Sequence, residues 1–121
     1  MDLKNLNISQ IQELLFSKKI TTVEIVNFYL QRIKKIDSQI KAFITVTEKE
    51  ALKQAKEIDA KIKKGESVGK LAGVVMAVKD IFLTNNIQTT ASSKVFKGYI
   101  PQYSSTVYKK LINENALIIG K

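Results

Sequence analysis

The first half of the chain shows the apolar spacing of amphipathic helices. Ser9 and Gln12 have the spacing of a capping box, in which two side chains satisfy backbone N–H groups at a helix start. One apolar face follows this pair, made of Ile11, Leu14 and Leu15. Because these positions lie three or four residues apart, we expect a first helix capped by Ser9.

A second capping box predicts a longer helix. Thr21 and Glu24 form this box, and Ile20 and Ile25 occupy the two positions of a hydrophobic staple around it. Apolar residues then recur at helical spacing, namely Val26, Tyr29, Leu30, Ile33 and Ile36. We expect this helix to continue to about Asp37.

A short strand and a third helix are predicted next. Residues 41–46, KAFITV, alternate and are rich in β-branched side chains, which is typical of a strand. Thr47 and Glu50 have the spacing of a third capping box, and Gly65 supplies the helix end. The inward face of this helix is expected to consist of Leu52, Ala55, Ile58 and Ile62.

After Gly65 the period of the pattern changes. Residues 74–78, VVMAV, and residues 116–119, ALII, are continuous apolar runs, as in strands covered on both faces in a parallel sheet. Residues 83–103 are rich in loop-forming residues. A helix capped by Ser104 or Ser105 is predicted between the strands, closed by Asn115, with Val107, Leu111 and Ile112 facing inward.

Strand, helix and strand form a βαβ unit, so the sequence predicts an α/β fold. We divide the chain into residues 1–65, a helical arm with one short strand, and residues 66–121, the start of an α/β core. The sequence stops at Lys121, directly after a strand expected inside a sheet. Because two parallel strands leave open edges, we expect these residues to be the beginning of a longer domain.

The composition excludes several kinds of chemistry. The chain has 121 residues with neither cysteine nor histidine, so it lacks disulfides, a thiolate nucleophile and the commonest general base and zinc ligand. No apolar run of ~18 or more residues is present, and the start MDLKNLNISQ has no apolar signal core. We therefore expect a cytoplasmic protein whose acid–base chemistry uses Lys, Asp, Glu or Tyr.

The net charge of +9 is compatible with nucleic-acid binding but does not define a site. Arg32 is the only arginine, whereas phosphate and base recognition favours the planar fork of arginine. The lysines are scattered, and many alternate with Asp and Glu. This distribution favours a solvated lysine-rich surface over a dedicated RNA site.

Lys79 is the candidate functional residue, since it follows the apolar run 74–78 directly. A lysine there most often marks the point where a strand reaches solvent. The functional interpretation is that ligand sites of α/β sheets lie at the carboxyl ends of strands. A partly buried ammonium has a lowered pKa and can then act as a base. From this pattern alone both interpretations stay open.

Four stretches change the balance between these interpretations. They are GKLAGVVMAVKD at 69–80, TTASSK at 89–94, PQYSSTV at 101–107 and ALIIGK at 116–121. In order and spacing they resemble the amidase signature family. Within that family, the arm and loops are most similar to the A subunits of aspartyl/glutamyl-tRNA amidotransferases. The resemblance implies the N-terminal part of the amidase signature fold, with helices flanking a mixed sheet, incomplete in these residues.

The resemblance also implies a mechanism. Family members hydrolyse amides with a serine nucleophile, a second serine in a cis peptide and a lysine, and the lysine maps to Lys79. In a complete subunit we expect a partly buried amine there. The Gly/Ser-rich signature that carries both serines is absent from this sequence. None of the serines in the matching stretches corresponds to a catalytic one, and loop hydrogen bonding and helix capping are expected of Ser92, Ser93, Ser104 and Ser105.

Substrates and partners follow from the same resemblance. The A subunit releases ammonia from glutamine and works with subunits B and C, and the ammonia amidates mischarged Glu-tRNA(Gln) or Asp-tRNA(Asn). ATP and Mg²⁺ are used at the partner subunit, so no cofactor and no metal is expected in this chain. Alternatives are a fragment of a stand-alone amidase, or a non-catalytic chain that docks on another subunit or on RNA.

Some positions depart from the family pattern. Val75 stands where proline is usual, Ala91 where cysteine is frequent in these subunits, and Ser104 where an acid is common. Asp80 follows Lys79 as the family pattern has it. A role in orienting the loop after the strand is as well supported for Asp80 as a functional role.

Overall fold

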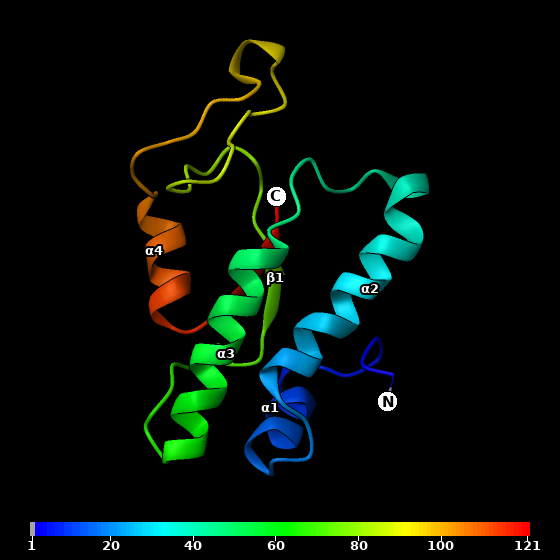
Figure 1. The fold of residues 1–121 in the computed structure, drawn as a ribbon, viewed down its shortest axis with the longest axis vertical. Helices are drawn as coiled ribbons and strands as arrows, with labels where there is room; N and C mark the ends of the chain where they lie inside the picture. The colour runs from blue at the N-terminus through cyan, green and yellow to red at the C-terminus, as the bar shows by residue number, and fades with distance from the viewer. Residues whose placement is uncertain (1) are drawn as a thin grey trace.

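The computed structural model describes residues 2–121. Its elements, drawn in Figure 1, are α1 (Ile8–Phe16), α2 (Thr22–Ile40), α3 (Glu48–Lys64), β1 (Val75–Ala77), the short 3-10 helix η1 (Lys94–Phe96), α4 (Thr106–Asn113) and β2 (Leu117–Gly120). Helices α2 and α3 lie side by side, and α4 lies apart from them, beyond the sheet (Figure 1).

The two strands form one parallel sheet. Val75 pairs with Leu117 and Met76 with Ile118, and a register shift then brings Ala77 opposite Gly120. Helix α4 connects the strands, so β1, α4 and β2 form the predicted βαβ unit. The predicted α/β class is therefore confirmed, with the strands three and four residues long.

The main core lies between the helices of the first half and the sheet. Helix α2 packs on α3, and α3 packs on β2. Ala51 and Ala55 on α3 are fully buried, and their small side chains allow a close approach to Ile25 and Val26 of α2, which are also fully buried. A second, smaller cluster under α4 contains Val78, Ala116 and Ile118, with Tyr108, Leu111 and Ile112 packed against it.

One of the three predicted capping boxes forms as expected. The Thr21 N–H donates to Glu24 Oε2 at 2.8 Å, and the Glu24 N–H donates to Thr21 Oγ1 at 3.2 Å. The box predicted at Ser9 is wrong, because Asn7 and Gln10 form the reciprocal pair two residues earlier. Gln12 instead donates from its amide to the carbonyls of Lys70 and Ala72, at 2.8 and 3.1 Å.

The third box is also wrong, although α3 begins where expected. Thr47 is the N-cap residue, but its side chain makes no capping hydrogen bond. The Thr47 hydroxyl is buried and donates to the Ile118 carbonyl at 2.9 Å, so it ties the helix to β2 instead. At the far end Gly65 adopts the left-handed conformation, φ 75°, and the predicted helix end is confirmed. Helix α2 extends beyond the expected Asp37 to Ile40.

The strand predicted at 41–46 is wrong. The Ile44 and Thr45 N–H groups both donate to the Lys121 carbonyl, at 2.8 and 3.1 Å, which bends the backbone and prevents a ladder. Only an antiparallel bridge between Val46 and Gly120 remains. The two segments approach so closely that a Cβ at Gly120 would lie 2.7 Å from the Thr45 carbonyl oxygen. Glycine is therefore required at this crossing.

Burial of the two strands differs. Strand β2 is buried throughout, whereas β1 is half-buried or exposed, so the expectation of a strand covered on both faces holds for β2 only. An apolar groove between α2 and β1 leaves β1 open, and it is lined in part by Ile33, Ile36, Val75 and Met76.

The predicted loop region, residues 83–103, contains only η1 and projects away from the helices at the top of Figure 1. In the fourth helix, Ser105 is the cap, and its hydroxyl accepts the Tyr108 N–H at 3.3 Å. Val107 is 49% exposed, so its predicted inward position is wrong. Among residues 2–121, no helix has both the length and the apolar character needed to cross a bilayer.

Candidate functional site

Lys79 lies two residues after the end of β1, at the carboxyl end of the strand, as predicted. On its N-terminal side, the Val78 N–H donates to the Gly120 carbonyl at 3.0 Å and continues the pairing with β2. The Lys79 carbonyl accepts the Phe82 N–H at 3.1 Å, which closes a turn. The side chain of Lys79 is exposed within residues 2–121, so the partial burial expected for a complete subunit is not seen here.

Asp80 is buried, with 5% of its surface exposed. Its Oδ2 accepts the Thr90 N–H at 3.0 Å and also the Thr90 hydroxyl. Its backbone carbonyl accepts the Ala91 N–H at 2.8 Å. These bonds hold the two ends of the 80–91 loop together, which is the loop-orienting role considered for Asp80.

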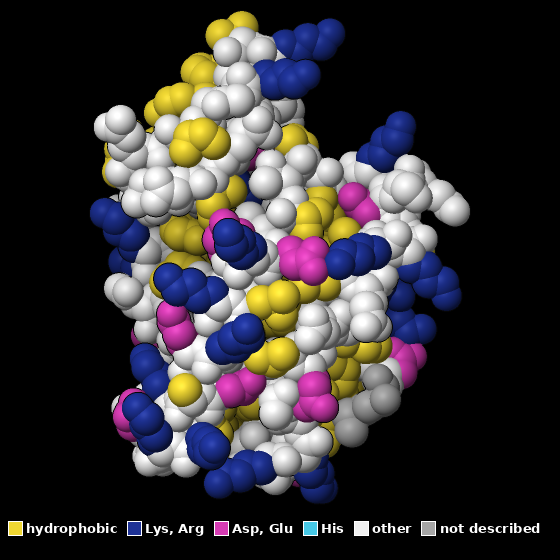
Figure 2. Space-filling model, in the orientation of Figure 1, with side chains coloured by type: hydrophobic (Ala, Val, Ile, Leu, Met, Phe, Trp, Pro, Cys, Tyr) yellow, Lys and Arg dark blue, Asp and Glu magenta, His cyan; other side chains and the backbone are white. Residues whose placement is uncertain are grey.

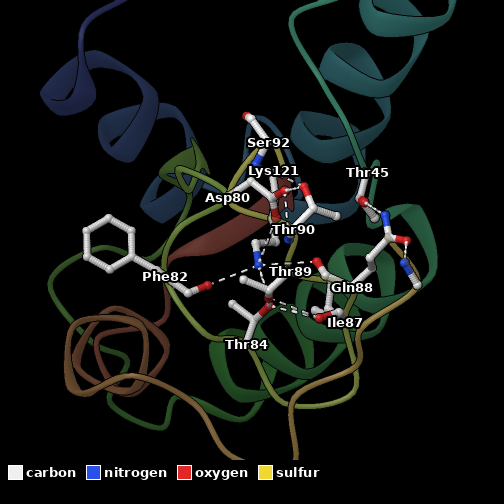
Figure 3. A network of polar contacts seen from close by, with 11 residues as sticks. Thr45, Asp80, Phe82, Thr84, Ile87, Gln88, Thr89, Thr90, Ser92 and Lys121 are labelled. Carbon is white, nitrogen blue, oxygen red and sulfur yellow. Dashed lines mark hydrogen bonds and ion pairs between the residues drawn. The ribbon is translucent and has the colours of Figure 1, made fainter. Parts of the chain in front are cut away.

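A second lysine, which the sequence pattern did not single out, lies at the centre of this loop. The side chain of Lys121 is fully buried, and its Nζ lies 3.3 Å from Asp80 Oδ1. Figure 3 shows the side chain reaching into the loop between Asp80, Phe82 and Thr89. The ammonium donates to four oxygens: Phe82 O at 3.0 Å, Thr84 Oγ1 at 2.9 Å, Gln88 O at 3.3 Å, and Thr89 Oγ1.

The charges of this pair depend on each other. Burial lowers the pKa of the Lys121 ammonium, and the neighbouring Asp80 carboxylate opposes that shift. An ammonium has three N–H donors, so the four surrounding oxygens are enough to satisfy it. Asp80 Oδ1 has no hydrogen-bond donor within residues 2–121 and faces Lys121 alone. Removal of either charge would therefore leave the other buried and unpaired.

The sequence contained a signal for Lys121. Both lysines follow a continuous apolar run, at 74–78 and 116–119, and the carboxyl ends of parallel strands meet at one edge of a sheet. The threonines at 84 and 89 supply short hydroxyl side chains that accept hydrogen bonds from the buried ammonium. The burial of Lys121 depends on these distant groups, so the local pattern does not distinguish it from an exposed lysine.

Three of the four serines in the matching stretches, Ser93, Ser104 and Ser105, have the side-chain contacts expected of them. Ser104 Oγ accepts the Asn85 N–H at 2.8 Å, and Ser93 Oγ accepts the Val95 N–H at 3.3 Å. Ser105 caps α4, and Ser92 donates its N–H to Thr90 Oγ1 at 3.1 Å. None is hydrogen-bonded to Lys79 in the part of the chain that the structure describes.

The described residues contain no metal-ligand cluster, and the basic side chains do not gather into one patch on the face drawn in Figure 2. From Asp2 to Lys121, no group of three or more His, Cys, Asp or Glu side chains is placed to hold a metal ion. Figure 2 shows the Lys and Arg side chains spread over the face drawn and interleaved with Asp and Glu. The candidate site is therefore an exposed amine, Lys79, on a loop fixed by the buried Asp80–Lys121 pair.

The sequence of this chain matches known amidases and amidotransferase subunits. The sequence profile of the family described as Amidase matches residues 24–121. The chain is 44% identical over 121 residues to the A subunit of the glutamyl-tRNA(Gln) amidotransferase of Thermoanaerobacter pseudethanolicus. It is also 44% identical over 115 residues, 95% of the chain, to the protein of the same name from Trichodesmium erythraeum. The chain spans about a quarter of these relatives, at their N-terminal ends.

Solved structures share the fold. A bacterial aryl acylamidase of the amidase signature family aligns with a TM-score of 0.88 and 28% identity, over 95% of this chain and 24% of its own. The peptide amidase of Stenotrophomonas maltophilia aligns with a TM-score of 0.92 and 24% identity, over 98% of this chain and 25% of its own. The match to the family profile covers most of the chain, and the fold agrees with it. The chain belongs to the amidase signature family.

Proposed function

We propose that residues 1–121 are the N-terminal part of the glutamine-hydrolysing A subunit of a tRNA-dependent amidotransferase, with Lys79 as its catalytic base. The identity of 44% over the whole chain to the A subunit of a glutamyl-tRNA(Gln) amidotransferase carries the proposal. The aryl acylamidase is 28% identical, which supports the stand-alone amidase alternative less well. The position of Lys79 at the carboxyl end of β1 agrees with a catalytic role.

In this mechanism Lys79 moves protons. Its neutral amine accepts a proton that a bridging serine relays from the nucleophilic serine, in a lysine version of an activated-nucleophile arrangement. The activated oxygen attacks the side-chain carboxamide carbon of glutamine. The proton held by Lys79 returns through the bridging serine to the leaving nitrogen as the C–N bond breaks, and ammonia leaves. Water then hydrolyses the glutamyl ester on the nucleophilic serine, which releases glutamate and regenerates the hydroxyl. Both serines belong to the three quarters of the relatives that this chain does not match.

The proposed partners follow from the same similarity. Subunits B and C would complete the assembly, and ATP with Mg²⁺ would activate mischarged Glu-tRNA(Gln) or Asp-tRNA(Asn) on the partner subunit. The described residues hold no metal-binding cluster, and the proposal needs none in this chain. The cytoplasmic location stays a prediction.

A chimera tests this function. Residues 1–121 replace the matching N-terminal quarter of the A subunit from Thermoanaerobacter pseudethanolicus, and the chimera is assembled with that enzyme's partner subunits. We expect it to release ammonia from glutamine and to lose this activity when Lys79 is replaced by Met. An assembled, folded chimera without glutaminase activity, or an active Lys79→Met variant, would contradict the proposal.

A further inference from the structure

We propose that Asp80 and Lys121 are positioning residues that fix the backbone on which Lys79 stands. The expected effect on catalysis rests on the proposed function, whereas the contacts that fix the Lys79 backbone are independent of it. The pair lies outside the Ser–Ser–Lys machinery, and its side chains are buried while that of Lys79 is exposed.

The attachments of Lys79 lie on both sides of it. Before it, the Val78 N–H is bonded to the Gly120 carbonyl, and after it, the Asp80 carboxylate faces Lys121 at 3.3 Å. Gly120 and Lys121 are consecutive residues at the end of β2. The segment that carries Lys79 is thus attached twice to the end of β2, once to the backbone of Gly120 and once to the side chain of Lys121.

Lys121 also fixes the turn that follows Lys79. Phe82 donates its N–H to the Lys79 carbonyl, and the carbonyl of the same Phe82 accepts a hydrogen bond from Lys121 Nζ at 3.0 Å. The ammonium therefore holds the far end of the turn that begins at Lys79. A displacement of the Lys121 side chain would therefore displace the backbone of Lys79.

The second half of the 80–91 loop completes the contacts around Asp80 and Lys121. The Gln88 carbonyl and the Thr89 hydroxyl accept from Lys121, while Thr90 donates to Asp80. Both limbs of the loop therefore converge on the same ion pair (Figure 3). Burial of the Lys121 ammonium inside this loop costs free energy, because a charged side chain loses its solvation by water.

The cost of burial argues for a role beyond stability. A buried ion pair is often no more stabilising than neutral residues of similar volume, but its hydrogen bonds fix directions that apolar packing does not. A base must be placed accurately, and a displacement of about 1 Å in a reacting group can lower the rate about 100-fold. Fixing the Lys79 backbone is a use of the pair that explains its cost.

The test uses the chimera with Asp80→Asn and Lys121→Met together, which removes both charges and leaves neither unpaired. We expect kcat for glutamine hydrolysis, per folded enzyme, to fall about 10-fold or more while KM changes less than about 2-fold. The matched control is Lys34→Met with Glu48→Gln, which removes an exposed ion pair of 2.9 Å and should leave kcat unchanged.

A second pair of variants covers the case in which the double variant does not fold. Thr89→Ser keeps the hydroxyl that accepts from Lys121, and Thr89→Val removes it at nearly constant volume. We expect the serine variant to retain the parent kcat and the valine variant to lose several-fold. Equal kcat in the two variants would overturn the inference.

Failure of the inference is distinguishable from failure of the proposed function. An inactive Lys79→Met chimera together with a folded double variant of unchanged kcat would overturn the inference alone. A readout independent of activity is the crystal structure of the double or valine variant, in which we expect the Lys79 Cα to move by about 1 Å or more relative to the parent chimera. An unmoved Lys79 backbone would overturn the positioning role even if the chimera were inactive.

Discussion

Two lysines of one sheet illustrate how differently the same residue type is used. Lys79 and Lys121 each follow a strand, yet the first is exposed and the second has a fully buried side chain. The side chain of the first is open to solvent, whereas Asp80 and four oxygens surround the ammonium of the second. Burial of a charge here depends on partners, and Lys79 has none of this kind within residues 2–121.

The first residue-scale prediction concerns replacement of Lys79 by arginine, a cation that does not lose its proton. In the chimera, we expect Lys79→Arg to lower glutaminase activity nearly as far as Lys79→Ala, because a guanidinium keeps its proton in proteins. Ammonia release from glutamine is the measurement, and Lys109→Arg, at an exposed position on α4, is the control. Substantial activity in the Lys79→Arg variant would leave only a charge role for this residue.

The second residue-scale prediction concerns alkaline pH. Because burial lowers the pKa of Lys121 from 10.5, the folded state binds fewer protons than the unfolded state between the lowered pKa and 10.5. Stability therefore rises with pH through this window, as far as Lys121 contributes. We expect the melting temperature of the chimera, relative to its Lys121→Met variant, to increase as the pH is raised toward 10.5. A constant or falling difference would contradict the assigned shift.

At the residue scale, features that depend on neighbouring residues in the sequence could be predicted, and features that depend on distant residues could not. Lys79 could be chosen as a candidate from its place after an apolar run and from the stretches around it, and its role stays a prediction. The burial of Lys121 could not, because Thr84, Thr89 and Asp80 surround it only after the sheet has formed. The contacts of Ser93 and Ser105 were predictable because each side chain bonds to a backbone N–H two or three residues away.

At the scale of elements, helix positions were easier to predict than the groups that start them. Three box spacings were present, and only Thr21 with Glu24 forms a box as predicted. A better-placed cap, Asn7, displaces Ser9, and β2 attracts the hydroxyl of Thr47. The strand expected at 41–46 fails for a related reason, since a strand needs a partner along its length and this segment meets β2 at one crossing.

This difference between caps gives the element-scale prediction. Thr21→Ala removes a side chain that satisfies the first turn of α2 and should cost about 1 kcal/mol locally, or about a fivefold increase in amide exchange there. Ser9→Ala is the matched control, because Ser9 lies inside α1 and its replacement should leave exchange nearly unchanged or slightly slower. Hydrogen-exchange mass spectrometry of the chimera measures both. If Ser9→Ala increased amide exchange in α1 more than Thr21→Ala increased it in α2, the caps would be assigned wrongly.

At the scale of the whole molecule, the described residues contain surfaces that are not covered. Strand β1 is paired with β2 on one side only, and the apolar groove along α2 opens beside it. On the projecting loop Val95 is 86% exposed and Tyr103 61% exposed. The relatives are about four times as long as this chain, which agrees with surfaces suited to contact with further chain.

The last prediction is that residues 1–121 alone neither hydrolyse glutamine nor behave as a stable monomer. No serine is bonded to Lys79 within residues 2–121, so the base has no nucleophile to activate.

The free edge of β1 favours pairing with other chains, because its backbone groups lack partners on that side. Ala77→Lys places a charge at an exposed position of this edge and should reduce association, whereas Asn27→Lys, exposed on α2, should not. Ammonia release, light scattering after size exclusion and a thermal melt measure these properties. Lys79-dependent turnover would refute the first part, and a sharp cooperative melt of a monomer would refute the second.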